Sequence, residues 1–349
     1  MMIKVLVVDD SALIRSLLSE IIKNEPNFLL VGAASDAYVA RDMVNQYRPD
    51  VITLDVEMPK VDGLTFLEKL MKARPTPVIM ISSLTEQGAE VTLRALELGA
   101  VDYLAKPKLD IAKGIEEYRQ EIVFKIKTAA LAKLSSKPKS TRTQSSPALR
   151  FKTTEKIIAI GASTGGTEAI KTVLTAMPID SPGIVITQHM PPGFTTSFAK
   201  RLNALCRITV LEAQGDERIV PGHAYLAPGD RHLTVVRSGA DYRIVLTDGP
   251  RVSGHKPSVD VMFESVAESV ASNALAVVLT GMGKDGALGI RYIAEHGGFT
   301  MAQDEATSLI FGMPQEAIKT GCVKQVVGLE SISCKLIEVL NAMGKDYRI

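Results

Sequence analysis

Ser163, His189 and Asp285 each follow an apolar segment rich in Ile, Val or Leu in the second half of the chain. Short apolar runs bounded by Gly and Pro are typical of buried strands in a parallel sheet. The carboxyl ends of parallel strands face one crevice, where ligands bind. A serine, a histidine and an aspartate in one crevice can act as nucleophile, general base and orienting carboxylate. The pattern therefore predicts a serine hydrolase.

Ser163 lies in a glycine-rich turn over residues 161–167, between a predicted strand and a helix that begins near Thr167. Glycine allows a tight turn, and a helix N-terminus supplies N–H donors and positive potential for an alkoxide or an oxyanion. We expect Thr164 and the backbone N–H of Met282 to line this oxyanion pocket. Two alternatives stay open: Ser163 or Thr164 only caps the helix, or the turn binds a dinucleotide. The glycines do not match G-x-G-x-x-G, which disfavours the dinucleotide.

The other two candidate residues lie in rigid or glycine-rich strand exits. His189 precedes a Met-Pro-Pro-Gly turn, which fixes the imidazole at the end of its strand. Asp285 lies in a third glycine-rich exit, and its carboxylate can accept a hydrogen bond from the imidazole and fix its tautomer. The chain order Ser, His, Asp differs from the orders of α/β-hydrolases and of two protease classes. His255 is either a fourth catalytic group or a residue that shapes the pocket, and both interpretations stay open.

The first half carries a second group of chemically active residues at predicted strand ends. Asp9 and Asp10 close the first strand, and Asp55 closes the third. Three carboxylates at one sheet edge repel each other strongly unless a cation is present, and Mg²⁺ suits such oxygen ligands. Ser82 ends the fourth strand and Lys106 follows the fifth, so a hydroxyl and an ammonium join the same edge. This arrangement predicts a Mg²⁺-dependent phosphoryl-transfer pocket.

The elements that must position these groups alternate along the chain. In the first half, strands are expected at residues 4–8, 29–33, 51–54, 78–81 and 103–105, with helices such as 11–24 and 63–73 between them. Such alternation indicates a doubly wound α/β fold. Apolar residues at helical spacing from Ile111 to Ile126 predict a last amphipathic helix that runs to about residue 134.

We divide the chain into a first domain (1–122), a helix extension with a flexible linker (123–152) and a second domain (153–349). The linker is rich in Ser, Thr, Lys and Pro, and is either a solvated spacer or a docking segment for an acidic partner. The second domain is also expected to be a doubly wound parallel sheet. Its short predicted strands at 225–227, 232–237 and 242–247 indicate a small antiparallel addition.

Composition narrows the class of protein. A net charge of +1 over 349 residues gives no reason to expect nucleic acid or an anionic membrane as the main partner. The three cysteines are not spaced as metal ligands, which favours a reducing compartment without a disulfide framework. No stretch approaches the roughly 18 apolar residues that span a bilayer. We therefore expect a cytoplasmic location and no direct membrane insertion.

The first domain resembles the response-regulator receiver domain, which has a flavodoxin-like fold. The resemblance rests on four segments: residues 7–11, 54–63, 81–82 and 102–107. It implies that Asp55 is the phosphoacceptor and that a chemotaxis histidine kinase is the phosphodonor. The implied Mg²⁺ ligands are Asp9, Asp10, Asp55 and the backbone carbonyl of Glu57. The implied switch residues are Ser82, Tyr103 and Lys106.

The second domain is similar to the catalytic domain of the chemotaxis protein-glutamate methylesterase family. The similarity rests on the three strand exits described above and on residues 253–263 and 312–314. It implies a phosphorylation-regulated hydrolase that removes glutamate methyl esters from chemoreceptors, releases methanol and in some members deamidates glutamine. The esterase reaction needs no cofactor. The competing hypothesis is a receiver with a non-enzymatic output; without a basic recognition helix, nucleic acid is not an expected partner.

Overall fold

The computed structural model describes residues 2–83, 85–106, 112–134 and 155–343. The chain forms two compact units, Met1–Pro138 and Lys139–Ile349, each of which is considered by itself. Of the predicted helix extension and linker (123–152), residues 135–152 lie outside the described residues. Among the described helices, none is both long enough and apolar enough to cross a membrane.

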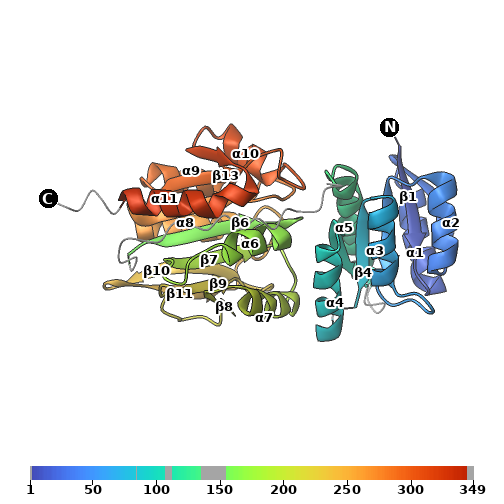
Figure 1. Ribbon diagram of the computed structural model, residues 1–349, viewed down its shortest axis with the longest axis horizontal. Coiled ribbons are helices and arrows are strands. Elements are labelled where there is room, and N and C mark those ends of the chain that lie inside the picture. The colour runs from blue at the N-terminus through green and yellow to red at the C-terminus, as the bar shows by residue number, and fades with distance from the viewer. Residues whose placement is uncertain (1, 84, 107–111, 135–154, 344–349) are drawn as a thin grey trace. The chain divides into compact units, whose positions relative to one another are not determined.

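Unit 1 contains, among its described residues, a five-stranded parallel sheet in the order β2-β1-β3-β4-β5. Its strands are β1 (Ile3–Val8), β2 (Phe28–Ala34), β3 (Val51–Asp55), β4 (Val78–Ser82) and β5 (Asp102–Ala105). The helices are α1 (Ala12–Lys23), α2 (Ala37–Tyr47), α3 (Gly63–Ala73), α4 (Glu86–Glu97) and α5 (Ala112–Ala130) (Figure 1). This strand order is that of flavodoxin-like folds, the fold that the resemblance to receiver domains implies.

The helices of unit 1 begin where the sequence supplies a capping side chain. Ser11, Asp36 and Asp62 each accept a hydrogen bond from a backbone N–H in the first turn of α1, α2 and α3. Such a cap satisfies a donor that has no partner within the helix. Every residue of β3 and β4 is buried, because helices cover both faces of a doubly wound sheet.

Helix α5 differs in two ways from the amphipathic helix that the sequence predicts. It ends at Ala130 and not near residue 134, and the predicted helix extension is its second half. Tyr118, Ile122 and Ile126 are buried, as expected for a core-facing stripe, but Ile115 is 50% exposed. The first residue of the stripe, Ile111, lies outside the described residues.

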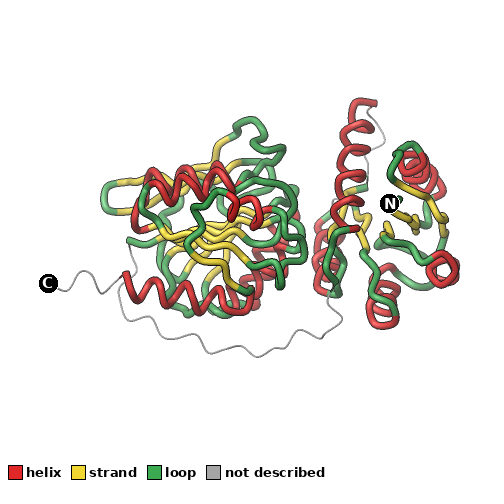
Figure 2. Tube along the Cα trace, turned by 90° about the horizontal axis from the view of Figure 1, so that it is seen from above, coloured by secondary structure: helices red, strands yellow, loops and turns green. Residues whose placement is uncertain are grey.

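Unit 2 contains, in its described part, a seven-stranded parallel sheet in the order β14-β13-β12-β6-β7-β9-β8. The strands are β6 (Ile157–Ala162), β7 (Gly183–Gln188), β8 (Thr209–Glu212), β9 (His223–Leu226), β12 (Ala274–Val278), β13 (Phe299–Gln303) and β14 (Gln325–Val327). The α-helices are α6 (Gly166–Thr175), α7 (Phe194–Leu205), α8 (Val259–Val270), α9 (Ala287–Glu295), α10 (Met313–Lys319) and α11 (Ile332–Met343). Figure 2 shows helices on both sides of this sheet.

The antiparallel part of unit 2 is smaller than the sequence predicts. Strands β10 (His232–Ser238) and β11 (Asp241–Thr247) form a hairpin, which is a separate two-stranded sheet. The expectation that residues 225–227 belong to the antiparallel addition is wrong. Tyr225 and Leu226 lie in β9, which pairs in parallel with both β7 and β8. Short strands of this length carry no sequence signal for the direction of pairing.

Gly161, the fifth residue of β6, allows helix α8 to pack closely on the sheet. A Cβ atom at this position would lie 2.2 Å from Cγ1 and 2.9 Å from Cγ2 of Val259, the first residue of α8. Since both residues are fully buried or nearly so, neither can move away into solvent. Glycine is therefore required by packing here.

We predict that Gly161→Ala lowers the free energy of unfolding of unit 2 by about 1–3 kcal/mol, because the added methyl group overpacks the contact with Val259. Urea unfolding of the full chain measures the effect. In a Val259→Ala background, which removes both Cγ atoms, the same substitution should cost much less. Equal costs in the two backgrounds would show that the packing explanation is wrong.

Candidate active site

Ser163 and His189 follow neighbouring strands of unit 2 at matching positions. Ala162 at the end of β6 pairs with Gln188 at the end of β7. The backbone N–H of His189 donates to the carbonyl of Ala162 (3.2 Å), and the side-chain amide of Gln188 donates to the carbonyl of Ser163 (3.0 Å). The register of the sheet thus places the serine and the histidine side by side at its carboxyl edge.

The turn that carries Ser163 is shaped by glycines and not by a side-chain cap. The N-cap of α6 is Gly165, which has φ +77° and makes no side-chain capping bond. The N-cap position of α6 is thus occupied by Gly165 and by neither Ser163 nor Thr164. A Cβ atom on Gly281 would lie only 2.7 Å from Cβ of Ser163, so the loop after β12 also needs glycine where it passes the serine.

Asp285 is joined to His189 by a hydrogen bond of 2.8 Å between Oδ2 and Nε2. The carboxylate is 1% exposed. Burial opposes its ionisation, but the hydrogen bond from His189, the attraction to that ring and backbone N–H bonds outweigh burial and lower the pKa of Asp285 to about 2. The aspartate is thus ionised at neutral pH, as an orienting carboxylate must be.

The contact with Asp285 defines the tautomer of His189. An ionised carboxylate can only accept, so Nε2 of His189 carries the proton and Nδ1 carries the lone pair. Nδ1 is buried, and no group among the described residues forms a hydrogen bond with it. The described contacts also include no hydrogen bond from the hydroxyl of Ser163. In uncomplexed enzymes such bonds often tighten only when substrate binds.

The predicted pocket residues lie close to this pair. The ring of His255 stacks on that of His189, with centroids 3.7 Å apart and planes 10° from parallel. Thr164 is buried, and its carbonyl accepts a hydrogen bond from the hydroxyl of Thr280 (3.1 Å). Met282 follows Gly281, the residue at which an added Cβ atom would lie 2.7 Å from Cβ of Ser163. The structure thus places all three residues around the serine or the histidine, while their parts in catalysis stay predictions.

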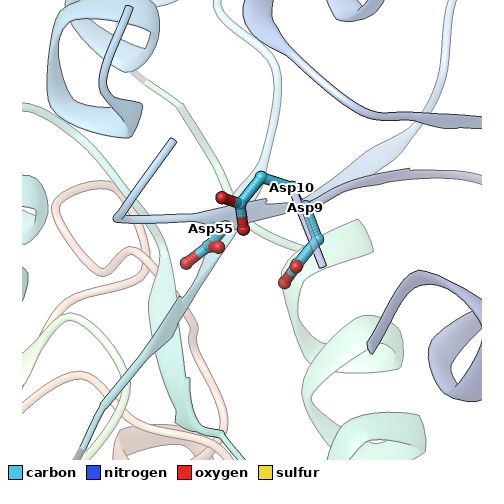
Figure 3. A group of neighbouring side chains, drawn as sticks. All are labelled: Asp9, Asp10 and Asp55. Carbon is cyan, nitrogen blue, oxygen red and sulfur yellow. The ribbon is translucent and has the colours of Figure 1, made fainter. Parts of the chain in front are cut away.

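In unit 1, three carboxylates gather at the carboxyl edge of the sheet, as the sequence predicts. Figure 3 shows Asp9 and Asp10 at the end of β1 beside Asp55 at the end of β3. One oxygen of each lies within 4.8 Å of the others. Asp9 and Asp55 are fully buried, and Oδ2 of Asp9 has no hydrogen-bond partner among the described residues. An unpaired buried carboxylate oxygen beside two further carboxylates fits a hard cation such as Mg²⁺.

The electrostatics of this cluster explain why a cation suits it. The pKa of Asp55 is raised to about 6, because burial and the charge of Asp9, which raise it, outweigh the hydrogen bond from Lys106, which lowers it. The ammonium of Lys106 lies 2.8 Å from Oδ2 of Asp55. Burial is also the main cause of the raised pKa of Asp9. One ammonium does not compensate the clustered negative charges, so the ionised cluster favours further positive charge.

The predicted switch residues occupy different positions around Asp55. Lys106 contacts it directly, whereas the hydroxyl of Ser82 donates to the backbone carbonyls of Gly88 (3.2 Å) and Ser83 (3.3 Å). Tyr103 is buried, with the ammonium of Lys125 5.3 Å from its ring centroid. The backbone N–H of Glu57 donates to Asp55 (3.2 Å). The role of the Glu57 carbonyl as a ligand stays a prediction.

Comparison with known proteins decides which family has this combination of sites. Residues 158–336 match the family described as CheB methylesterase, and residues 5–116 match the response regulator receiver domain. The chain is 58% identical, over the full length of both chains, to protein-glutamate methylesterase/protein-glutamine glutaminase 2 of Pseudomonas aeruginosa. The chain belongs to the CheB methylesterase family. A non-enzymatic output domain, the competing hypothesis, is therefore not supported.

Further relatives agree with this membership in the CheB methylesterase family. The chain is 53% identical to protein-glutamate methylesterase/protein-glutamine glutaminase of Salmonella typhimurium, with 99% of each chain covered. The crystal structure of the Thermotoga maritima CheB methylesterase catalytic domain is similar, with a TM-score of 0.52 and 39% identity. That similarity covers 53% of this chain and 98% of the crystallised one. The CheB catalytic fold is thus the fold of unit 2.

Sequence reasoning missed several residues that hold this CheB site together. Asp285 also accepts hydrogen bonds from the hydroxyl of Ser258 (2.8 Å) and the backbone N–H of Val259 (2.8 Å). Gln188 supports the serine turn from the end of β7. One of these features could have been recognised in the sequence: Ser258 is a typical N-cap residue and precedes an apolar run, which predicts the start of a helix. That signal predicts the helix but not its contact with a carboxylate 27 residues later.

The stacking of His255 on His189 allows the two interpretations of His255 to be tested by substitution. We predict that it positions His189, so His255→Phe, which keeps a ring for the stack, should retain most of the turnover. His255→Ala should lower turnover about tenfold, which corresponds to the loss of one aromatic contact. Turnover of a methyl ester measures both variants. His223→Ala, at a histidine whose Nδ1 contacts the carbonyl of Pro221 (3.1 Å), is the control. Equal loss in the Phe and Ala variants would contradict the positioning role and favour direct catalysis.

Proposed function

We propose that this chain is a phosphorylation-regulated serine hydrolase that demethylates glutamate γ-methyl esters on chemoreceptors and deamidates receptor glutamines. The single observation that carries the proposal is the hydrogen bond between Asp285 and His189 beside Ser163 at adjacent strand ends. Membership in the CheB methylesterase family and the names of full-length relatives support the choice of substrate.

The first half of the reaction is acyl transfer to the serine. Nδ1 of His189 accepts the proton of the Ser163 hydroxyl, and the oxygen attacks the ester carbonyl. Asp285 stabilises the imidazolium that forms. Backbone N–H groups, for which Met282 is the proposed donor, hold the oxyanion of the tetrahedral intermediate. His189 then gives its proton to the departing methanol, or to ammonia when the substrate is a glutamine.

The second half of the reaction frees the enzyme. Water loses a proton to Nδ1 of His189 and attacks the glutamyl ester on Ser163. The tetrahedral intermediate collapses, the bond to the Ser163 oxygen breaks and the imidazolium returns the proton to that oxygen. The product is a glutamate carboxylate. No cofactor takes part in either half.

In the receiver, Asp55 is the proposed phosphoacceptor. Asp9, Asp10, Asp55 and the backbone carbonyl of Glu57 would hold Mg²⁺, which supplies charge neutralisation for the incoming phosphoryl group. Lys106 already contacts Asp55 and would bind a phosphoryl oxygen. Ser82 would rotate from its bond with Gly88 toward the phosphoryl group, and Tyr103 would respond to this movement. The phosphodonor is a chemotaxis histidine kinase or a small acyl phosphate.

The proposed partners follow from these two reactions. Methylated chemoreceptors are the substrate of unit 2, and the kinase is the donor for unit 1. The modified receptor helices lie in the cytoplasm, which is the proposed location of this chain. Neither nucleic acid nor direct membrane insertion is part of the proposal.

The function is tested by methanol release from methylated receptor membranes. Ser163→Ala removes the nucleophile and should lower turnover by about 10⁶, as in other hydrolases whose triad acts as a unit. His189→Ala should be similarly inactive, and Asp285→Ala should retain more activity because orientation is only part of the catalysis. Release by Ser163→Ala at the wild-type rate would refute the proposed function.

The phosphoacceptor is tested with labelled acetyl phosphate and Mg²⁺. Wild type should take up acid-labile phosphate and show higher turnover, whereas Asp55→Asn should show neither effect. Burial raises the pKa of Asp55 in the metal-free cluster, and bound Mg²⁺ should lower it again, so labelling should depend more steeply on the Mg²⁺ concentration at pH 5 than at pH 7. Removal of Mg²⁺ with a chelator should also abolish labelling. Full labelling of Asp55→Asn would identify a different acceptor.

A further inference from the structure

An aspartate at the N-terminus of each of the helices α8 and α9 accepts hydrogen bonds from backbone N–H groups of the other helix. Asp285 lies just before Gly286, the N-cap of α9, but it accepts from the backbone N–H groups of Val259 (2.8 Å) and Asp260 (2.9 Å) in the first turn of α8. Asp260 lies in that turn of α8, and its Oδ1 accepts from the backbone N–H groups of Gly286 (2.9 Å) and Gly289 (2.8 Å) at the start of α9. Each aspartate therefore caps the helix of the other.

The exchange matters because it attaches the backbone next to Asp285 to α8, in addition to the hydrogen bonds that the Asp285 side chain accepts from Ser258, Val259 and Asp260. The loop from Gly281 to Gly286 contains no regular strand or helix, and Gly283 and Gly286 both have φ +91°. Glycines at positive φ leave the unbonded chain with many accessible conformations. The bond from Gly286 to Asp260 ties the residue directly after Asp285 to α8. The position of the Asp285 carboxylate beside His189 is thus determined from both sides.

The location of Asp260 also carries an electrostatic cost. Its side chain is 8% exposed. Burial, and next the charge of Asp285, raise the pKa of Asp260 to about 6, while the bonds from Gly289 and Gly286 act in the opposite direction. A second carboxylate beside the ionised Asp285 opposes folding unless the bonds that it accepts compensate.

We propose that Asp260 is a positioning residue of the hydrolase, which holds the loop of Asp285 so that Oδ2 of Asp285 stays bonded to Nε2 of His189. Asp260 acts through its acceptor oxygen and does not touch the reacting atoms. The inference deepens the proposed function and rests on it, because it assumes that His189 is the general base. Its structural readout, the bond between Asp285 and His189, can nevertheless be measured without substrate.

The test compares three variants of the full chain. Asp260→Ala removes the acceptor, and Asp260→Asn keeps a carbonyl oxygen that can accept the same two backbone bonds without a charge. Ser265→Ala is the matched control on the same helix, because the hydroxyl of Ser265 accepts a backbone N–H from Val235 (3.0 Å) on the β10–β11 hairpin. All three substitutions remove or change a side chain that accepts a hydrogen bond from a backbone N–H group. Only the substitutions at Asp260 affect the loop that carries Asp285.

Two readouts separate positioning from a general loss of stability. The first is the low-field proton resonance of the His189 ring, identified among the five histidines by its loss in His189→Gln and in Asp285→Ala. The second is the division of the kinetic effect between kcat and KM on a methyl ester. Thermal unfolding of each variant is measured in parallel.

Asp260→Ala should lose the low-field resonance and lower kcat about a hundredfold with little change in KM, as expected when a reacting group is misplaced by about 1 Å. Asp260→Asn should keep the resonance and most of the turnover. Ser265→Ala should lower the unfolding temperature but keep both. If Asp260→Ala does not fold, Asp260→Ser takes its place, because its shorter side chain likewise loses the hydrogen bonds from Gly286 and Gly289.

Two results would overturn the proposal. One is an Asp260→Ala variant that keeps the resonance and kcat while only its stability falls, as in the control. The other is an Asp260→Asn variant that folds but loses the resonance, since its acceptor oxygen is intact. Failure of the proposed function would look different: Ser163→Ala would still hydrolyse the ester, whatever the resonance of His189 showed in the Asp260 variants.

Discussion

The ionised carboxylate of Asp285, held almost entirely away from water, is the constraint on which the catalytic unit depends. Isolated burial of such a charge is strongly unfavourable. Among the described residues, Asp285 accepts four hydrogen bonds, from His189, Ser258, Val259 and Asp260. Removing one partner of a buried charged pair generally costs about 3–5 kcal/mol. The start of α8, the loop after β12 and the imidazole must therefore fit together as a group.

The pKa of a buried aspartate is shifted in opposite directions in the two units, and each direction matches the proposed role of that carboxylate. Asp285 has a lowered pKa because its bonds outweigh burial. Asp55 has a raised pKa because burial and the charge of Asp9 outweigh the contact with Lys106. A satisfied carboxylate is suited to a fixed orienting role. A carboxylate with an excess of negative charge nearby is suited to bind a cation and to accept a phosphoryl group.

The sequence predicts much of this arrangement because strand ends carry the chemistry. Apolar runs followed by polar residues locate Asp9, Asp55, Ser163 and His189, since parallel strands deliver their carboxyl ends to one edge. The features that escaped prediction depend on tertiary contacts. The direction of β9 depends on its neighbours in the sheet. No local pattern shows that the ring of His255 stacks on His189, or that Asp260 and Asp285 exchange caps across 25 residues.

The central claim, that Ser163 attacks the substrate with His189 as its base, is tested most directly by trapping the covalent intermediate. The full chain is mixed with a peptide that carries a glutamate γ-methyl ester, quenched in acid within one turnover and digested for mass spectrometry. The account predicts a glutamyl adduct on the peptide that contains Ser163, and no adduct in Ser163→Ala or His189→Ala. An adduct on another residue, or ester hydrolysis at the wild-type rate by Ser163→Ala without any adduct, would contradict it.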